Sequence, residues 1–394
     1  MGDNMQALVL RGDWDPKDGY VVSRQEQESG KATCASAVWR NPKITLEHQP
    51  VPRIADDEVL LKVKACGVCG SDTHCFETDP DGYVIFSGPV KLPVIMGHEY
   101  SGEVVEVGRA VTTLKVGDPV APEGMLWCGV CRPCRTGHPN QCRHLEMVGF
   151  SSPGAFAEYI AVKEKYCWKL DDLRQVCNSD QEMYEIGALI EPIGCSYNGM
   201  FVSAGGFLPG AHVAVFGAGP IGLGAVLMAR AAGAARIVVF DVVDQRCNLA
   251  VEMGADAAYN PIALAREGTS PHEIVMDITD GHGADMLVEA AGAAPHTVPE
   301  IEQSYAPNGK MVYLGRAATA VEAQLDVLVS NANSIAGARG HAGYGIFPNI
   351  IRMLATGRIP AAKMITARYP FAQVLDALER STTRTDGKIM VRFS

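Results

Sequence analysis

The stretch from His212 to Asp241 reads HVAVFGAGPIGLGAVLMARAAGAARIVVFD and decides the fold. Its first five residues are an apolar run that predicts a β-strand, and a glycine-rich turn, a helical pattern and a second strand follow. Further strand patterns occur in GADMLVEAAG, from Gly283, and in GKMVYLG, from Gly309. Strands that alternate with helices predict βαβ units around a parallel sheet.

The glycine-rich turn has the G-x-G-x-x-G spacing at Gly217, Gly219 and Gly222, and Pro220 and Ile221 open the helix. The glycines permit a tight turn and let the backbone approach a pyrophosphate, which then meets the free N–H groups of the helix N-terminus. The pattern alone is weak evidence, but here it follows a strand and opens a helix. We therefore predict that these five residues bind a dinucleotide.

Asp241 ends the next predicted strand, about twenty residues after the turn. A carboxylate there can accept hydrogen bonds from ribose hydroxyls and would repel a 2′-phosphate, so it favours NAD over NADP. Arg246 lies nearby and could instead accommodate that phosphate. We include both residues in the predicted cofactor site, with NAD as the expected cofactor.

The rest of the chain has a different character. The first third reads as short β-strands with turns, apart from a polar stretch at 11–31 that we expect to be an extended surface hairpin or loop. After about Gly340, two helical patterns precede a terminal strand in GKIMVRF. We predict an α/β protein in which residues 1–198 and 343–394 form one domain and residues 199–342 form an inserted, doubly wound domain.

Four cysteines cluster in GMLWCGVCRPCRTGHPNQC, at Cys128, Cys131, Cys134 and Cys142. Four thiolates fill every position of a tetrahedral zinc ion and leave none for a substrate. The alternative is a set of unpaired surface thiols. We predict a structural zinc lobe at about 124–145.

Residues suited to a second metal ion are spread along the chain. CGVCGSDTH contains Cys69, GHEYSGEVVEVG contains His98 and Glu99, and ALIEPIGCSYN contains Glu191. One thiolate, one imidazole and carboxylates suit zinc with an open position for substrate. Each residue alone also fits an ordinary role, such as core packing, a turn or a helix start. Their occurrence together, ahead of a dinucleotide motif, favours a catalytic metal site.

These motifs together resemble the zinc-dependent medium-chain alcohol and polyol dehydrogenases over nearly the whole chain. The resemblance is stronger to the sorbitol and threonine dehydrogenase branch than to the ethanol branch, which has a second cysteine at the position of Glu191. It implies a GroES-like, β-rich catalytic domain and a Rossmann domain. It also implies an NAD-dependent enzyme with two zinc ions per subunit.

The resemblance also assigns roles to single residues. Cys69 and His98 would bind the catalytic zinc, Glu191 would complete the shell directly or through water, and Glu99 would exchange in and out. Ser71 and His74 would pass the substrate proton to solvent. Asp72 would orient His98 and raise its basicity as a ligand.

The expected reaction is oxidation of a secondary hydroxyl in a polyol or cyclitol, with scyllo-inosose or a related inositol derivative as the best single substrate. Sorbitol, threonine or an aminocyclitol is the alternative within the class, and a non-enzymatic NAD-binding redox sensor is a remote one. Arg339 and His341 lie where the family's chain returns to the cleft, so we expect them to contact substrate hydroxyls.

Composition limits the remaining possibilities. The net charge of -11 argues against a nucleic-acid partner, and no apolar run approaches the ~20 residues that span a bilayer. The N-terminus does not read as a signal peptide, and the twelve cysteines cluster at metal spacings. We therefore expect a cytoplasmic protein with a small-molecule substrate and no membrane partner. The resemblance implies a homo-oligomer, either a dimer or a tetramer.

Overall fold

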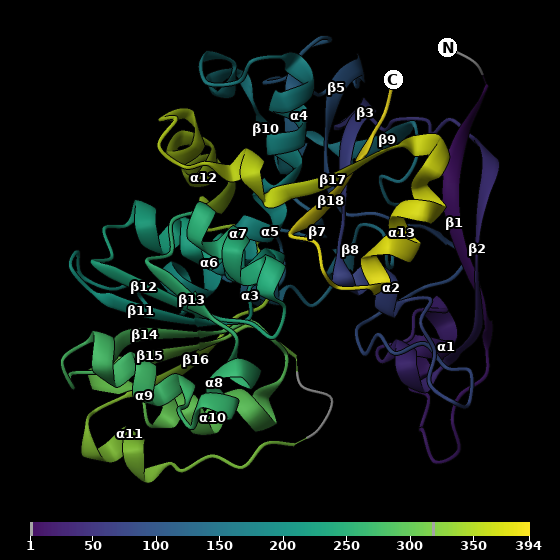
Figure 1. Cartoon of the computed structure of the whole chain (residues 1–394). Coiled ribbons are helices and arrows are strands. Elements are labelled where there is room, and N and C mark those ends of the chain that lie inside the picture. Colours follow the sequence, from purple (N-terminus) through teal and green to yellow (C-terminus); the bar gives the residue numbers. More distant parts are fainter. Residues whose placement is uncertain (1–2, 317–319) are drawn as a thin grey trace. The chain divides into compact units, whose positions relative to one another are not determined.

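The computed structural model describes residues 3–316 and 320–394 and divides the chain into two compact units (Figure 1). The first unit comprises Met1–Glu191, Ala367–Arg384 and Ile389–Ser394, and the second comprises Pro192–Thr366 and Thr385–Lys388. The first boundary lies close to the one predicted after residue 198. The return to the first unit comes at Ala367 instead of 343, because the helix that follows Gly345 packs within the second unit, where Phe347 lies against His341.

The first unit is built on antiparallel sheets. Its largest sheet has seven strands in the order β10-β6-β5-β3-β18-β17, with β9 also paired to β3. A three-stranded sheet has the order β2-β1-β4, and β7 pairs with β8. The strands are β1 (Asn4–Trp14), β2 (Trp39–Pro50), β3 (Glu58–Val68), β4 (Val94–Ile95), β5 (Glu99–Val107), β6 (Pro119–Pro122), β7 (Met125–Leu126), β8 (Glu146–Met147), β9 (Tyr159–Lys163), β10 (Cys167–Lys169), β17 (Ile365–Pro370) and β18 (Lys388–Arg392).

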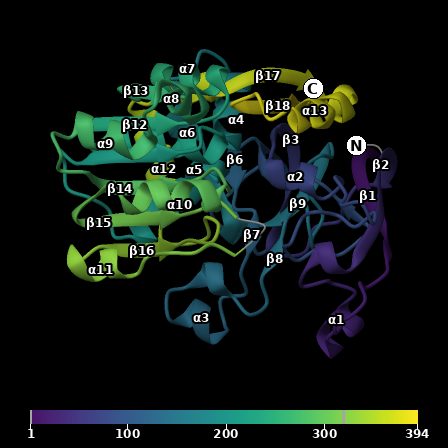
Figure 2. The same cartoon turned by 60° about the horizontal axis from the view of Figure 1, so that its bottom comes forward.

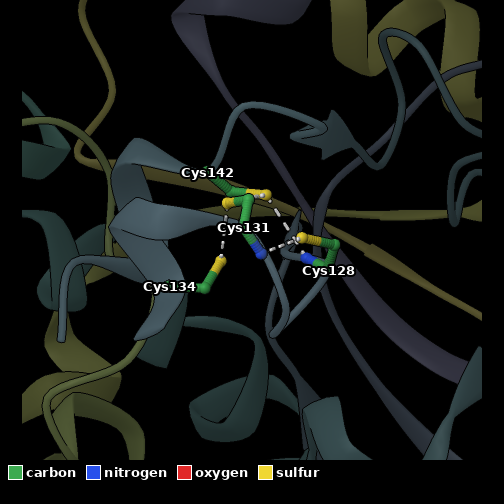
Figure 3. Close-up of side chains that lie close together, drawn as sticks. All are labelled: Cys128, Cys131, Cys134 and Cys142. Carbon is green, nitrogen blue, oxygen red and sulfur yellow. Dashed lines mark hydrogen bonds between the residues drawn. The ribbon is translucent and has the colours of Figure 1, made fainter. Parts of the chain in front are cut away.

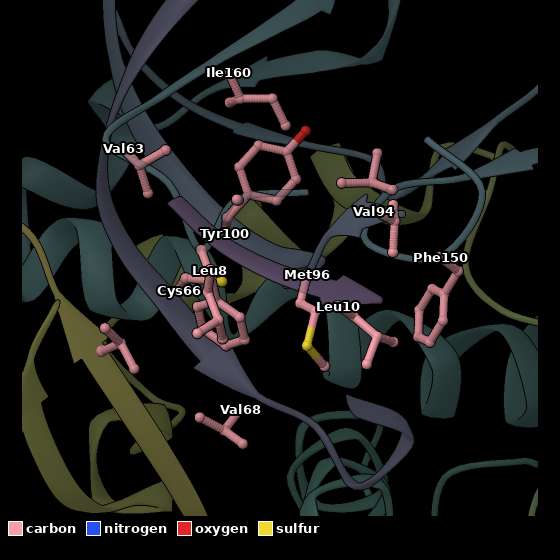
Figure 4. Packing of buried hydrophobic residues seen from close by; sticks show 14 of the residues in the cluster. Leu8, Leu10, Val63, Cys66, Val68, Val94, Met96, Tyr100, Phe150 and Ile160 are labelled. Atoms are coloured by element: carbon pink, nitrogen blue, oxygen red, sulfur yellow. The ribbon is translucent and has the colours of Figure 1, made fainter. Parts of the chain in front are cut away.

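The core of the first unit lies between these sheets. Leu8 and Leu10 of β1 pack with Met96, Tyr100 and Phe150, all at most 2% exposed (Figure 4). Burying a side chain of this size contributes about 1.5–3 kcal/mol. This core includes residues of β3 and β5, and the candidate metal ligands lie at or next to the ends of these two strands.

The polar stretch at 11–31 is partly the expected hairpin. β1 and β2 pair antiparallel as far as Trp14 and Trp39, but a short helix, α1 (Arg24–Ser29), follows. Ser23 and Glu26 form a capping box at its N-terminus, a pairing that satisfies two free backbone N–H groups. Burial opposes the charge of Glu26, but hydrogen bonds from neighbouring backbone and hydroxyl groups outweigh it and lower the pKa of Glu26 to about 2.

The second unit contains a six-stranded parallel sheet in the order β13-β12-β11-β14-β15-β16 (Figure 2). This is the doubly wound order 3-2-1-4-5-6, whose ligand crevice lies where the strand order reverses, between β11 and β14. The strands are β11 (His212–Phe216), β12 (Arg236–Phe240), β13 (Ala257–Tyr259), β14 (Ala284–Glu289), β15 (Tyr305–Tyr313) and β16 (Ser334–Gly337). The parallel sheet predicted from the glycine-rich stretch is confirmed.

Helices complete both units. They are α2 (Gly70–His74), α3 (Arg132–Arg135), α4 (Asp180–Ala188), α5 (Ile190–Tyr197), α6 (Pro220–Ala231), α7 (Asp244–Glu252), α8 (Pro261–Glu267), α9 (Pro271–Ile278), α10 (Ala294–Glu302), α11 (Asp326–Ser330), α12 (Ile346–Ala355) and α13 (Val374–Thr382). Within the described residues, none of these helices has both the length and the apolar character that a membrane span requires.

Candidate active site and metal centres

The predicted catalytic ligands Cys69, His98 and Glu99 lie together in the first unit, with their ligand atoms within 4.8 Å of one another. Cys69 is the N-cap of α2, and Glu99 is the first residue of β5, paired with Gly67 at the end of β3. His98 and Glu99 are buried, whereas Cys69 is partly exposed. Residues from two elements that are far apart in sequence therefore meet at the end of the large sheet.

Asp72 fixes the geometry of this group. It is fully buried, its Oδ2 accepts a hydrogen bond of 2.9 Å from the Cys69 N–H, and its Oδ1 lies 3.3 Å from His98 Nδ1. Burial opposes the charged form of His98, but the Asp72 carboxylate outweighs it and raises the pKa of His98 well above its usual value. With Nδ1 directed at Asp72, Nε2 is the atom left to bind a metal.

The donor set fits zinc. Zinc binds thiolate sulfur at about 2.3 Å and imidazole nitrogen at about 2.0–2.1 Å, so a tetrahedral shell requires those two atoms to lie about 3.6 Å apart. The group around Cys69 contains the thiolate, imidazole and carboxylate donors that zinc takes, and its ligand atoms all lie within 4.8 Å of one another.

Two further predicted residues flank the group. Ser71 Oγ lies 3.5 Å from His98 Nε2, which places the hydroxyl beside the metal-binding face of the imidazole. His74 ends α2, and burial together with the positive charge of Arg384 lowers the pKa of His74 below its usual value. A neutral imidazole can both accept and donate a proton, as the predicted relay requires.

Glu191 is placed differently. It is the second residue of α5 and is buried, but it is not part of the group around Cys69. Glu99 is the carboxylate that the structure brings to the predicted metal ligands. Whether Glu191 also takes part stays a prediction.

The four cysteines of the predicted lobe converge on one point (Figure 3). Cys131 Sγ lies 3.5 Å from Cys134 Sγ and 3.8 Å from Cys142 Sγ. A zinc ion with Zn–S bonds of about 2.3 Å requires sulfur atoms about 3.8 Å apart, so the spacing fits a closed tetrahedral shell. Backbone N–H groups also point at the sulfurs, as in the 3.3 Å contact from Cys131 N to Cys128 Sγ.

The glycine-rich turn has the conformation that its sequence predicts. Gly217 follows β11 with φ +98°, where a side chain would be strained. A Cβ built on Gly222 would lie 1.7 Å from the Gly217 oxygen, so only glycine fits there. Gly219 caps α6, whose first residues are Pro220 and Ile221. The helix N-terminus is therefore open to a phosphate.

Asp241 lies directly after β12 and is buried. Its Oδ2 accepts a hydrogen bond of 2.6 Å from the Ala218 N–H in the glycine-rich turn, and its Oδ1 accepts one of 2.8 Å from the Val243 N–H. Each carboxylate oxygen can accept a further bond, so the group remains suited to ribose hydroxyls. Arg246 on α7 lies close to the turn, with its terminal nitrogen 3.8 Å from the point where a Gly219 Cβ would stand.

The predicted substrate residues both follow β16 in the second unit. The Arg339 oxygen accepts a hydrogen bond of 3.2 Å from Asn198 Nδ2, and burial together with the charge of Arg316 lowers the pKa of Arg339. His341 is buried, and its Nδ1 lies 4.0 Å from Cys195 Sγ. Sequence reasoning did not single out Cys195, although its position four residues after Glu191 on a predicted helix start was a usable signal.

A chain with these features has the two parts of a zinc-dependent dehydrogenase: a β-rich unit with two groups of residues that could hold a metal ion, and a doubly wound unit with a glycine-rich turn of the dinucleotide-binding type. Comparisons with known proteins agree. The alcohol dehydrogenase GroES-like domain profile matches residues 55–172, and the zinc-binding dehydrogenase profile matches residues 220–356. The chain belongs to the zinc-dependent alcohol dehydrogenase family, so it is an oxidoreductase.

Individual relatives cover almost the whole chain. It is 37% identical to scyllo-inosose 3-dehydrogenase of Thermotoga maritima over 96% of this chain and 97% of that protein. It is 32% identical to L-threonine 3-dehydrogenase of Bacillus licheniformis over 89% of this chain and 95% of that protein. It is also 32% identical to a protein of Aspergillus terreus described as D-xylulose reductase A, over 86% of this chain and 91% of that protein.

Solved structures give the same result. A Thermotoga maritima protein assigned as an alcohol dehydrogenase superposes with a TM-score of 0.93 at 36% identity, covering 98% of this chain and all of that one. A Sinorhizobium meliloti protein assigned as a zinc-binding dehydrogenase, bound to NADP, superposes with a TM-score of 0.77 at 28% identity over 92% and 98% of the two chains. An Escherichia coli alcohol dehydrogenase in complex with NADH has a TM-score of 0.77 at 25% identity, over the whole of both chains.

Proposed function

We propose that this protein is an NAD-dependent dehydrogenase that oxidises a secondary hydroxyl of a polyol or cyclitol, with scyllo-inosose or a related inositol derivative as the substrate. The observation that carries the proposal is the convergence of Cys69, His98 and Glu99 beside Ser71 and Asp72. A thiolate, an imidazole and a carboxylate leave one position of a tetrahedral ion for the substrate oxygen.

Each residue of the group then has a task. Cys69 and His98 would hold the catalytic zinc together with one carboxylate. Glu99 and Glu191 would alternate in that third position, so that the fourth stays open for the substrate. Bound there, zinc acts as a Lewis acid that stabilises negative charge on a hydroxyl oxygen. Asp72 keeps the His98 ring in place through Nδ1. The cysteines of the lobe hold a second, structural ion, which gives two zinc ions per subunit.

Ser71 and His74 move the substrate proton. The Ser71 hydroxyl lies beside His98 Nε2, so it can accept a hydrogen bond from the substrate hydroxyl and take its proton as the carbon is oxidised. His74 lies five residues after the N-cap of α2, and burial and Arg384 lower its pKa, which favours the neutral imidazole that can pass the proton outward. A nicotinamide cofactor bound at the glycine-rich turn would supply the hydride acceptor.

The cofactor assignment rests on Asp241. Its carboxylate is fixed by two backbone N–H groups at the end of β12, where the adenosine ribose of a dinucleotide lies in this fold. A fixed negative charge there favours the 2′-hydroxyl of NAD over the 2′-phosphate of NADP. Relatives with NADP and with NADH are both known, so Arg246 near the turn is the feature that could favour NADP.

The substrate class follows from polar groups and from relatives. Arg339 is exposed and His341 is buried, and a buried polar group disfavours a substrate that lacks hydroxyls to pair with it. The relative with 37% identity acts on scyllo-inosose. L-Threonine is the second candidate, because L-threonine 3-dehydrogenases at 32% identity cover almost as much of the chain.

A substrate panel tests the proposal. The zinc-loaded protein is given NAD with scyllo-inosose, myo-inositol, sorbitol, L-threonine or ethanol, and NADH absorbance is followed. We expect the highest kcat/KM with a cyclitol and the lowest with ethanol. A preference for threonine or sorbitol would leave the family intact and remove the cyclitol assignment, whereas a preference for ethanol would contradict the polar-site argument.

The protein is also proposed to be a homo-oligomer, a dimer or a tetramer. β16 is the last strand of the parallel sheet, and Ile335 within it is 46% exposed. An open sheet edge with an apolar side chain is a ready surface for pairing with another copy. Light scattering during size-exclusion chromatography tests the assignment, and a monomer at micromolar concentration would contradict it.

A further inference from the structure

Glu289 is a buried carboxyl group that the mechanism above does not use. It is the last residue of β14, its side chain is fully buried, and its Oε1 accepts a hydrogen bond of 3.2 Å from Thr297 Oγ1 on α10. Within the described residues, its Oε2 is buried and makes no well-aligned hydrogen bond. Buried polar atoms without a partner are rare, so this one calls for an explanation.

Three loops at the carboxyl edge of the parallel sheet meet around this side chain. A Cβ built on Gly315, after β15, would lie 2.2 Å from Glu289 Oε2 and 2.3 Å from the Gly292 nitrogen. A Cβ built on Gly217, after β11, would lie 2.6 Å from the Ala291 nitrogen. The turn after β11 and the loops after β14 and β15 therefore touch one another with no space for a side chain, and the Glu289 carboxyl is enclosed among them.

The edge of the sheet at which Glu289 lies is the edge where doubly wound folds bind their ligands. The strand order reverses between β11 and β14, so a dinucleotide crosses the sheet edge there, with its pyrophosphate at the N-terminus of α6. Asp241 at the end of β12 marks the adenosine half. The other half of a dinucleotide would then lie over the ends of β14 and β15, and Glu289 is the last residue of β14.

Burial favours the protonated form of the Glu289 carboxyl group. It raises the pKa of Glu289, while hydrogen bonds from Thr297 and from the backbone N–H groups of 291–293 act in the opposite direction. When it is protonated, the group keeps one acceptor oxygen for Thr297 and has an O–H donor on the other oxygen.

We propose that Glu289 is a positioning residue for the nicotinamide half of the cofactor: its buried carboxyl group fixes the loops after β11, β14 and β15 in the arrangement that receives this half. The inference rests on the proposed binding of a nicotinamide dinucleotide, but it does not depend on the choice between NAD and NADP, which differ only at the adenosine ribose.

The test compares Glu289→Gln with Glu289→Ala. Glutamine has the same shape and is neutral, with one acceptor and one donor group, so it should replace the acid. We expect Glu289→Ala to raise the dissociation constant for the cofactor by about tenfold, the effect of losing one or two buried hydrogen bonds. The dissociation constant of Glu289→Gln should stay within about threefold of the wild-type value, because this change alters the geometry of about one hydrogen bond and removes none. Binding is measured by fluorescence titration with NAD and, in parallel, with NADP.

Kinetics separate positioning from general stability. In Glu289→Ala the KM for the cofactor should rise while the KM for the substrate and the zinc content stay at wild-type values. Glu300→Ala is the matched control: this residue lies on α10, and its carboxylate accepts a 2.9 Å contact from His272 away from the sheet edge. It should leave cofactor binding unchanged.

Each outcome decides one question. Wild-type cofactor affinity in a folded Glu289→Ala, or a loss in Glu289→Gln equal to that in Glu289→Ala, overturns the inference. If Glu289→Ala does not fold, the Glu289→Gln result still decides, because wild-type affinity supports a neutral acid and a tenfold loss rejects it. If the wild type binds neither dinucleotide, the proposed function itself falls, and this inference falls with it.

Discussion

Replacing Asp72 with asparagine tests whether the group around Cys69 is a zinc site. The carboxylate makes two contacts: Oδ2 accepts the Cys69 N–H at 2.9 Å, and Oδ1 lies 3.3 Å from His98 Nδ1. Asparagine has nearly the same shape, and its carbonyl oxygen can keep the first contact. The second contact loses its negative charge, so His98 becomes a weaker and less well oriented ligand.

The expected loss can be estimated from that single contact. Removing the hydrogen-bond partner of a metal-binding histidine lowers metal affinity by about 10–100-fold. This corresponds to about 1.4–2.8 kcal/mol, because each 1.4 kcal/mol is a factor of ten. Asp72 contacts Cys69 and His98, so the ion proposed at that group should be lost and the ion proposed at the cysteine lobe should be retained.

The assay is competition with a chelator, followed by elemental analysis of the protein. At a chelator concentration where the wild type keeps both ions, Asp72→Asn should keep one. Asp118→Asn is the matched control, because Asp118 is also a buried aspartate of the first unit and binds Lys169 Nζ at 2.8 Å and the Lys115 N–H at 3.0 Å. It should lower the melting temperature without changing zinc content. Wild-type zinc affinity in Asp72→Asn would refute the assignment of His98 as a ligand.

Three further changes give separate predictions. Cys69→Ala should abolish turnover and leave the melting temperature nearly unchanged. Cys131→Ala should lower the melting temperature strongly, since a structural zinc contributes on the order of 10 kcal/mol to a small metal-bound unit. Thermal melts and initial rates that show the reverse would mean that the catalytic and structural roles of the two sites are exchanged. The wild type should have a higher kcat/KM with NAD than with NADP, and Asp241→Ala should lower the ratio of these two values. A wild-type preference for NADP would indicate that Arg246 determines the choice of cofactor. Glu26 has a pKa of about 2, below the usual value of 4.5, so its contribution to stability is present above pH 4.5 and is lost as the pH falls toward 2. Chemical denaturation between pH 2 and pH 6 should show that the free energy of unfolding of Glu26→Gln falls less steeply at acid pH than that of the wild type. An equal fall in both proteins would contradict the pKa shift.

Local sequence was sufficient for the parts of the site that lie within one short segment. The turn from Gly217 to Gly222 needs a positive φ at its first glycine and close backbone approach at its last, and both requirements are visible in the residue types. The four cysteines of the lobe lie within 15 residues, so their spacing alone predicted that they meet. In both cases the chain has little freedom to place these residues apart.

Residues that are brought together by tertiary structure were harder to place. Cys69 and Glu99 meet only because β3 and β5 pair so that Gly67 lies opposite Glu99, a register that no local pattern specifies. Family resemblance, and not spacing, supplied that assignment. The same limit applies to Glu191, which the resemblance assigns to the zinc but which lies outside the group that the structure forms.

Glu289 shows why such residues escape notice. In the sequence it is the polar end of an apolar strand, and nothing near it indicates a binding site. Its importance comes from three glycine-containing loops that are distant in sequence and that leave no space around its carboxyl group. A fully buried acid costs stability, so its presence at the crevice of a doubly wound sheet favours a role that packing alone does not require. The proposed cofactor site would then depend on this buried support as well as on the glycine turn that the sequence displays.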